Sequence, residues 1–400
     1  MNVLFLTMNI FTGIEMHNIY SDLMKEFIKH GHRPYIVTPR ERKMGEKTEL
    51  VDFDTYSLLK VQTGNTSDVS LIEKGISTVM MGTLFYNAVR EKLGKLNFDL
   101  ILYSTPPITL AATVSRLKKM FKCKTYLMLK DIFPQNAVDL EMFSTNSIIY
   151  KYFRRKEKQL YAVSDYIGCM SQANVDYVLK NNPEVSSDRV GICPNSIDPF
   201  DISLTGQERA TMRDKYGIPQ NKTVFVYGGN LGKPQGIPFL IECLRSQRDN
   251  EEVFFLIVGD GTEYSKLLNY IETEKQPNVK LISLLPKADY DKVVAACDVG
   301  MIFLDHRFTI PNFPSRLLAY MQAKLPVLAV TDPVTDIGKV ICEGGFGWWC
   351  ESNRVEDFCK IIRTISSEGQ LGEMSVKSRE YLEANYNVHS AYSEIVGVVS

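Results

Sequence analysis

The sequence lacks a long hydrophobic run. Its longest apolar stretch, Ile76 to Val89, is interrupted by polar residues and by Gly82, and it is shorter than the ~20 residues that a helix needs to cross a bilayer. We therefore expect no transmembrane helix. The chain starts with the strand-like run Val3 to Leu6, without a basic leader or a small-residue cleavage site, which predicts a cytoplasmic protein.

A strong net charge is also absent. Lysine and arginine number 46 and aspartate and glutamate 47, so the formal net charge is −1 at pH 7. No overall positive field would recruit nucleic acid, which argues against that partner. Two local basic clusters occur, from Arg116 to Lys124 and from Lys151 to Lys158. Each is either a solvated helix face or a peripheral docking site for anionic lipid.

Metal-binding patterns are missing as well. The eight cysteines have no CxxC spacing, and the five histidines are dispersed without an HExxH pair. These absences argue against a zinc hydrolase and predict reduced thiols. Asp52-Phe53-Asp54 is a DxD sequence, but such a short pattern is frequent by chance. We assign no metal and expect no cofactor.

Two successive patterns of alternating strands and helices fill the chain. In the first half, predicted strands are followed by helical patterns, beginning with a run at 3–7 and a helix from Met16 that stops at Gly31. After a turn-rich linker at 189–198 the alternation restarts, with strands predicted at 224–227, 253–258 and 279–285. The alternation predicts parallel sheets, and 400 residues exceed one core. The expected fold class is α/β, with two Rossmann-like doubly wound domains facing a central cleft.

The strongest local signal is the loop from Tyr227 to Gly236, between a strand and a helix. Its glycines let the backbone approach a ligand closely, and the helix start offers amides to a phosphate, with Lys233 as an added charge. A turn that merely needs glycine explains this segment equally well. The loop matches neither Walker A nor GxGxxG.

A second loop, starting at His306, leads into a helix near Ser315 and Arg316. Ser315 and the first-turn amides could hold a diphosphate, with Arg316 as a bidentate donor. The alternative is an ordinary helix cap with a solvated arginine.

Asp131 follows a predicted strand in the first half of the chain. Its carboxylate could act as a base or orient an acceptor hydroxyl, although a local turn hydrogen bond is the simpler interpretation.

Several stretches together resemble glycosyltransferase family 4, a group of retaining enzymes with the GT-B fold. The resemblance covers nearly the whole chain and is greatest to the WbuB-like branch of bacterial surface-polysaccharide glycosyltransferases. The stretches that carry it are Asn2 to Leu6 with His30-Gly31-His32, Pro194 to Asp198, Val258 to Gly261 and Ala295 to Val299.

The chain departs from the larger family at four positions. Asn230 and Gln235 replace the arginine and lysine of a G-R-L-x-x-x-K-G loop, and a Glu-x7-Glu element falls on Pro311 and Ala319. The WbuB-like branch instead has G-N-x-G-x-x-Q-G and P-S-[KR]-L elements, which this chain matches at 229–236 and 314–317.

The resemblance implies a UDP-sugar donor and transfer with retention, in which the departing phosphate oxygen accepts the acceptor's proton and no enzymic nucleophile is needed. It implies that Lys233 and Arg316 stabilise the charge of the diphosphate, together with Ser315 and the helix-start amides. With Asp131, placed by its position after a strand, Lys233 and Arg316 are the predicted catalytic residues. The implied donor-binding residues are Gly13, Gly229, Asn230, Lys233, Gln235, Gly236, Leu285, His306, Arg307, Ser315, Arg316 and Leu317.

The implied organisation is an acceptor-binding domain at 1–198, a donor-binding domain at 199–378 and a helix at 379–400 that returns to the first domain. The implied activity moves a sugar, such as the N-acetylated deoxyhexosamine FucNAc, to a lipid-linked (polyprenyl-diphosphate) glycan in capsule or O-antigen biosynthesis. One alternative is a nucleotide-sugar 2-epimerase, whose acidic and histidine cluster the sequence does not show. Another is a non-catalytic GT-B-like binding subunit, suggested by the missing Glu-x7-Glu element.

Overall fold

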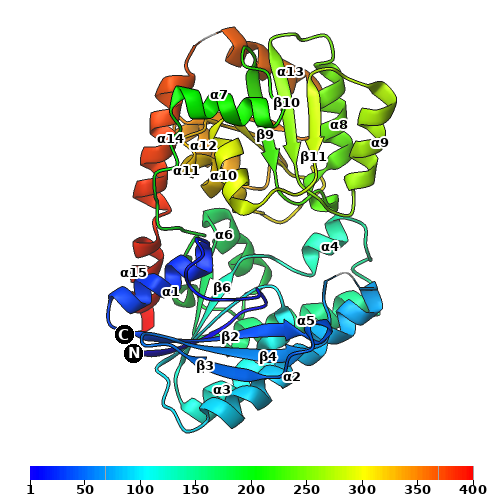
Figure 1. Cartoon of the computed structure of the whole chain (residues 1–400). Coiled ribbons are helices and arrows are strands. Elements are labelled where there is room, and N and C mark those ends of the chain that lie inside the picture. Colours follow the sequence, from blue (N-terminus) through cyan, green and yellow to red (C-terminus); the bar gives the residue numbers. More distant parts are fainter. Residues whose placement is uncertain (68, 368, 400) are drawn as a thin grey trace. The chain divides into compact units, whose positions relative to one another are not determined.

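The computed structural model describes residues 1–67, 69–367 and 369–399. They form two compact units. In Figure 1 the chain can be followed from the first unit into the second and back to the first. The first unit comprises Met1–Asp198 and the segment from Val388, and the second comprises Pro199–Asn387. The chain thus passes to the second unit after residue 198, where the sequence places a boundary. It returns at Val388 rather than at 379, because Arg379 donates a hydrogen bond of 2.9 Å to the carbonyl oxygen of Phe200 and so packs with the second unit.

The first unit is built on an eight-stranded sheet with the order β3-β4-β2-β1-β5-β6-β7-β8. Only the β3 and β4 pair is antiparallel among the described strands. The strands are β1 (Asn2–Leu6), β2 (Arg33–Glu41), β3 (Glu49–Asp52), β4 (Ser57–Thr63), β5 (Leu100–Ser104), β6 (Lys124–Leu129), β7 (Tyr166–Cys169) and β8 (Val190–Ile192).

Helices cover both faces of this sheet, as expected for a parallel sheet with crossover connections. They are α1 (Ile19–Lys29), α2 (Leu71–Leu93), α3 (Ala111–Phe121), α4 (Gln135–Asp139), α5 (Ile148–Val163), α6 (Gln172–Asn181) and α15 (Val388–Val399), with the 3₁₀ turns η1 (Arg42–Met44), η2 (Ile108–Leu110) and η3 (Ser187–Arg189). Helix α15 packs against α1. Its buried residues Ala391, Tyr392 and Ile395 join the same core as β1.

Helix α1 begins later than its hydrophobic pattern predicts. The Asn18 side chain accepts hydrogen bonds of 3.0 Å from the amides of Tyr20 and Ser21 and caps the helix there. Met16 therefore lies before the helix and is exposed. Gly31 ends the element with a positive φ of 76°, as the sequence predicts.

The second unit has a six-stranded parallel sheet with the order β11-β10-β9-β12-β13-β14. Its strands are β9 (Thr223–Gly228), β10 (Val253–Val258), β11 (Val279–Ile282), β12 (Val299–Phe303), β13 (Val327–Thr331) and β14 (Gly347–Glu351). Its helices are α7 (Gly206–Lys215), η4 (Lys233–Gln235), α8 (Ile237–Ser246), α9 (Tyr264–Glu274), α10 (Lys287–Ala295), α11 (Arg316–Gln322), α12 (Ile337–Glu343), α13 (Val355–Ser367) and α14 (Leu371–Asn385). The strand predicted at 279–285 ends at Ile282.

The strand order of the second unit is that of a Rossmann sheet, with the chain reversing direction across the sheet between β9 and β12. In the first unit the same reversal lies between β1 and β5. The prediction of an α/β fold with two doubly wound units is therefore confirmed. Ligands of such sheets bind beyond the carboxyl ends of the strands at the reversal point, so the loops after β9 and β12 are where a site is expected in the second unit.

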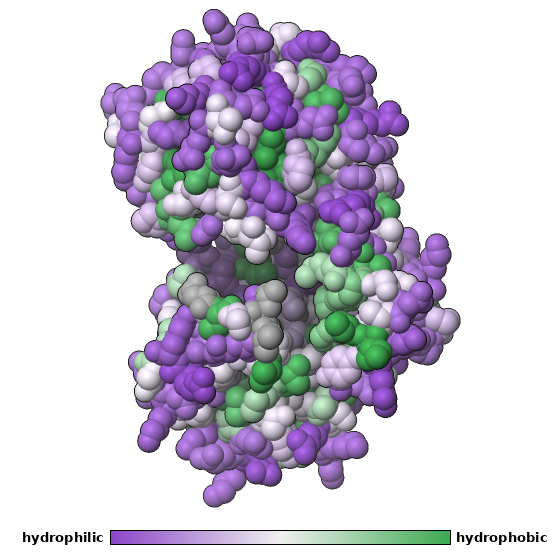
Figure 2. All heavy atoms as spheres, turned by 90° about the vertical axis from the view of Figure 1, so that its right-hand side faces the viewer, coloured by the Kyte–Doolittle hydropathy of each residue, from purple (hydrophilic) through white to green (hydrophobic). Residues whose placement is uncertain are grey.

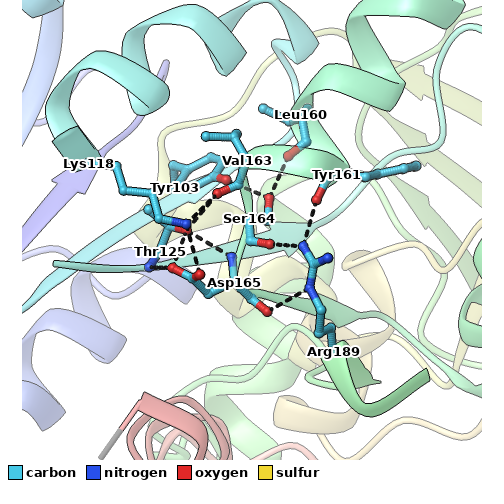
Figure 3. A network of polar contacts seen from close by, with 9 residues as sticks. All are labelled: Tyr103, Lys118, Thr125, Leu160, Tyr161, Val163, Ser164, Asp165 and Arg189. Carbon is cyan, nitrogen blue, oxygen red and sulfur yellow. Dashed lines mark hydrogen bonds and ion pairs between the residues drawn. The ribbon is translucent and has the colours of Figure 1, made fainter. Parts of the chain in front are cut away.

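A polar network in the first unit joins the end of α5 to α3, β6 and η3 (Figure 3). Arg189 donates to the carbonyl oxygens of Tyr161 at 3.1 Å, Asp165 at 3.2 Å and Ser164. Lys118 donates to the Val163 carbonyl at 3.1 Å. These cations satisfy carbonyls that have no partner within the helix at its C-terminus, where positive charge is also favoured by the helix dipole.

Hydrophilic residues cover most of the surface that Figure 2 shows, and hydrophobic residues gather in a few patches. Across residues 1–67, 69–367 and 369–399, no helix is both long enough and apolar enough to cross a bilayer.

Candidate functional site

The loops that follow β9 and β12 lie against each other at the reversal point of the second sheet. The Asp305 amide, just after β12, donates a hydrogen bond of 2.9 Å to the carbonyl oxygen of Pro234. The Gly229 amide donates at 2.9 Å to Val258, the last residue of β10. These backbone bonds hold the glycine-rich loop at the edge of the sheet where a doubly wound fold binds its ligand.

The glycine-rich loop is closed by its own side chains. The Gln235 Oε1 accepts hydrogen bonds from the Asn230 Nδ2 at 3.2 Å and from the Gly232 amide at 3.1 Å. Gly236 has a φ of 58°, and a Cβ there would lie 3.3 Å from the Asp305 Cα, so a larger residue is strained at this position. Asn230 and Gln235, which are predicted to contact a ligand, therefore stabilise the conformation of the loop through these hydrogen bonds. Lys233 is exposed.

Arg316 lies beside this loop, and no carboxylate of the described residues pairs with it. Its guanidinium carbon is 4.3 Å from the centroid of the Tyr227 ring, and its Nη2 lies 3.5 Å from the position of a Cβ on Gly229. The Nη1 atom is buried and has no hydrogen-bond partner among the described residues. A buried guanidinium donor without a partner is costly, so this position favours an anionic ligand that would accept from Nη1.

Tyr320, one turn after Arg316 on α11, fixes the end of β9. Its hydroxyl accepts from the Gly228 amide at 3.0 Å and donates to the Met301 carbonyl oxygen at 2.9 Å. Gly300 leaves room for the ring, because a Cβ there would lie 2.4 Å from it. Tyr227 donates to the Asn230 carbonyl at 2.7 Å. Two tyrosines thus position the loop and the arginine, and the sequence analysis missed both.

Arg307, which is predicted to contact the donor, is paired with a carboxylate in the structure. Its Nε and Nη2 donate to the two oxygens of Asp305 at 2.9 and 2.8 Å. Burial would raise the pKa of Asp305, but the hydrogen bonds and charge of Arg307 lower it overall. Arg307 is therefore neutralised by a carboxylate two residues away. His306 is exposed beside this pair.

Three further predicted contacts differ in what they offer. The Leu317 side chain is fully buried in the core, so only its backbone could meet a ligand. Ser315 is exposed and makes no side-chain cap of α11. Leu285 is half-buried in the loop after β11.

The helix starts provide fewer free amides than the sequence suggests. Pro238 in the first turn of α8 has no N–H, and the amides of Phe239 and Leu240 donate to the Gly236 carbonyl at 2.9 and 3.1 Å. At α11 the amides of Leu317 and Leu318 are also used, by Pro314 and Ser315. Binding of an anion here consequently depends more on Arg316 and Lys233 than on helix amides.

Asp131 and Gly13 belong to the first unit, in the loops after β6 and β1. The Asp131 carboxylate accepts from the Asn136 Nδ2 at 2.9 and 3.1 Å, and burial raises its pKa to about 6. Burial also lowers the pKa of the neighbouring Lys130 to about 8. Perturbed groups at strand ends are typical of functional sites. Lys130 is therefore a candidate functional residue that the sequence analysis missed. Gly13 lies next to the Tyr56 hydroxyl.

The comparisons with known proteins agree with this architecture. Residues 208–385 match the family model for glycosyl transferases group 1. The chain is 25% identical over 335 residues to WbjE of Pseudomonas aeruginosa, named a probable glycosyltransferase, with 82% of this chain and 80% of that protein covered.

Two solved structures share the fold over the full length of the chain. One is Anabaena Alr3699/HepE in complex with UDP and glucose, with a TM-score of 0.72 and 16% identity, covering 100% of this chain and 99% of that one. The other is WaaG, a glycosyltransferase involved in lipopolysaccharide biosynthesis, with a TM-score of 0.65, 14% identity and coverage of 100% and 99%. The GT-B fold and the transferase class expected from the sequence are confirmed. The chain is a glycosyltransferase of the GT-B fold, and its residues 208–385 match the family model for glycosyl transferases group 1.

Proposed function

We propose that the second unit binds the diphosphate of a UDP-sugar through Arg316. The observation that carries this proposal is the buried Nη1 of Arg316, which has no partner among the described residues. The same guanidinium lies beside the glycine-rich loop, with its Nη2 3.5 Å from the position of a Cβ on Gly229. A guanidinium suits the paired oxygens of a diphosphate. The HepE structure holds UDP and glucose, which supports the choice of donor class.

The proposed reaction breaks the bond between the anomeric carbon and the diphosphate oxygen and forms a bond from that carbon to the acceptor oxygen. The acceptor's proton passes to the departing phosphate oxygen, and the configuration is retained. Arg316 and Lys233 stabilise the negative charge that develops on the diphosphate, which is the main requirement of such a step. In the acceptor site, Asp131 orients the acceptor hydroxyl.

The proposed acceptor is a lipid-diphosphate-linked glycan of a bacterial surface polysaccharide, met by the first unit at a membrane surface. At the start of α5, Ile148 is 85% exposed and Ile149 53% exposed. Lys151 and Arg155 lie exposed on the same helix and make no ion pair within the described chain. Exposed apolar residues beside unpaired cations are what an interfacial helix presents to anionic lipid.

Two more observations support this acceptor class. On α2, Ile76, Val79 and Met80 are exposed, and η2 packs against both α2 and α5, so the two helices belong to one region of the first unit. WaaG, which shares the fold, is involved in lipopolysaccharide biosynthesis. We propose an N-acetylated deoxyhexosamine as the sugar, which follows from the resemblance to the WbuB-like branch.

The test of the donor site is thermal unfolding with and without UDP, for the wild type and Arg316→Ala. A nucleotide at 100 times its Kd stabilises a protein by ~2.7 kcal/mol, and ~1 kcal/mol raises Tm by about 2–4 °C in a domain of this size. We expect UDP to raise the Tm of the wild type and not of Arg316→Ala, while GDP, ADP and CMP have little effect.

Arg245→Ala is the matched control. Its guanidinium lies on α8 and already pairs with Glu274 at 3.0 Å, so the variant should keep the UDP response. An unchanged UDP shift in Arg316→Ala would exclude the arginine as the diphosphate ligand. Transfer from UDP-sugars to lipid-linked acceptors would then be assayed with the same two variants.

A further inference from the structure

Helices α1 and α15 bring together three side chains that are far apart in the sequence. The Glu26 Oε1 lies 3.1 Å from the His30 Nε2 and 2.9 Å from the His389 Nδ1. All three ligand atoms lie within 4.8 Å of one another. Glu26 and His30 are one turn apart on α1, and His389 is the second residue of α15, where the chain has just re-entered the first unit.

We propose that Glu26, His30 and His389 form a binding site for a divalent transition-metal ion, zinc in particular, which fastens helix α15 to helix α1. One carboxylate and two imidazoles are a common zinc ligand set, with bonds of 2.0–2.2 Å. The edge of such a tetrahedron is about 3.3 Å long. The distances of 3.1 and 2.9 Å to Glu26 are within a few tenths of an ångström of that edge. The two imidazole nitrogens lie within 4.8 Å of each other, and rotation of the exposed rings would bring them to the edge length around the ion.

The surroundings of the cluster hold its rings in place. The His30 ring stacks on the Tyr392 ring, with centroids 4.3 Å apart. The second ring nitrogen of His389, Nε2, lies 3.5 Å from the Ser393 Oγ. Metal-binding histidines use a contact at the nitrogen that does not bind the metal to fix the orientation of the ring. Tyr392 is buried and its hydroxyl lies 2.8 Å from the His32 Nε2.

The cluster also has access for an ion. Glu26 is buried, whereas the His30 and His389 side chains are 36% and 61% exposed. An ion bound here would have three protein ligands and an open fourth position for water. Lys29 contacts the other carboxylate oxygen, Oε2, at 3.3 Å, so it does not occupy the position between the three ligand atoms.

Without a metal, the two histidines simply share hydrogen bonds with Glu26, which is an ordinary helix contact. The two states can be distinguished by substitution with glutamine. An amide in place of either imidazole can still donate to Glu26, but it is a poor ligand for zinc. His30→Gln and His389→Gln should therefore preserve the docking of α15 and lose the metal.

The experiment is isothermal titration of the metal-stripped full-length protein with ZnCl₂, followed by thermal unfolding in the presence of the ion. We expect one bound zinc ion, a higher Tm with zinc, and affinity at least tenfold weaker in each glutamine variant. His306→Gln and Cys342→Ser remove exposed groups elsewhere and should bind zinc like the wild type.

A second measurement identifies the ligands directly. Cobalt(II) bound in a tetrahedral site gives visible absorption bands, which should be present in the wild type and absent from the double variant His30→Gln/His389→Gln. The proposal is wrong if the wild type binds no zinc at 100 µM, or if the double variant binds it with unchanged affinity. Neither result depends on glycosyl transfer, so the test is independent of the proposed function.

Discussion

Two ionisable side chains, Arg316 and Asp131, are held in the structure without an opposite charge among the described residues. Arg316 faces the Tyr227 ring, and Asp131 relies on the amide of Asn136. Proteins tolerate such groups mainly where binding or chemistry needs them, and they do so at the expense of stability. The arrangement of Asp131 therefore gives a prediction about stability that is separate from its proposed role in transfer.

The carboxyl of Asp131 should make the protein less stable as the pH rises. Its pKa is about 6 in the folded protein and about 3.9 when unfolded, so the folded state binds more protons between these values and stability falls through that window. We expect Asp131→Asn to stabilise the protein by about 1–3 kcal/mol at pH 7.5 and to have little effect near pH 4.

Urea unfolding at the two pH values measures this difference. Asp176→Asn is the control, because Asp176 lies exposed on α6 and should give no such pH-dependent gain. An equal gain from Asp131→Asn at both pH values would mean that the raised pKa of Asp131 is not its cause.

At the scale of single elements, the network around Arg189 predicts the stability of the first unit. Arg189→Ala removes a cation that donates to three carbonyl oxygens at the end of α5. Those carbonyls would lose their partners, and we expect a loss of about 2–3 kcal/mol. Chemical unfolding measures this loss of stability. The control is Arg155→Ala, at an exposed position on α5, which should change stability by less than about 0.5 kcal/mol. A small loss in Arg189→Ala would show that water replaces the guanidinium.

The proposed contact of helix α5 with a membrane surface gives a further prediction. Ile148→Asp/Ile149→Asp should weaken co-sedimentation with vesicles of anionic phospholipid, and Lys151→Glu/Arg155→Glu should do so most at low salt, since each basic residue contributes about 1 kcal/mol near such a surface. Val376→Asp, at an exposed position on α14, should leave binding unchanged. Equal binding of all variants would place the lipid contact elsewhere.

The sequence predicted the elements well because their signals are local. Alternating strands and helices, the stop at Gly31 and the glycine-rich loop after β9 all depend on neighbours along the chain. Where a side chain of another segment decides, the prediction was incomplete. Leu317 is buried in the core although its motif suggested ligand contact. The start of α1 was predicted too early for a local reason, because Asn18 caps the helix after Met16.

The candidate site was predicted in part for the same reason. Arg316 and the loop of Gly229 were identified from their motifs, but the stacking of Arg316 on Tyr227 joins residues far apart in the chain. Arg307 pairs with Asp305, and no sequence pattern separates a paired arginine from a free one. The cluster of Glu26, His30 and His389 depends on the return of α15, which spacing alone cannot reveal.

At the scale of the whole molecule, the two units have separate cores. We therefore expect calorimetry to resolve two unfolding transitions, and UDP to raise the temperature of only one of them. Arg189→Ala should lower the other, because Arg189 lies in the first unit. A single transition that UDP shifts as a whole would mean that the units unfold together.

The path of the chain has one more consequence. The second unit leaves the first after Asp198 and returns at Val388, and the Val388 amide donates a hydrogen bond of 2.9 Å to the carbonyl oxygen of Ile197. The points of departure and re-entry are thus neighbours in one unit, so the second unit is a continuous insert with adjacent ends. Gene fusion could exchange such an insert for that of another glycosyltransferase while leaving the surrounding sheet intact. Under the proposed function, that exchange would recombine the donor preference of one enzyme with the acceptor preference of another.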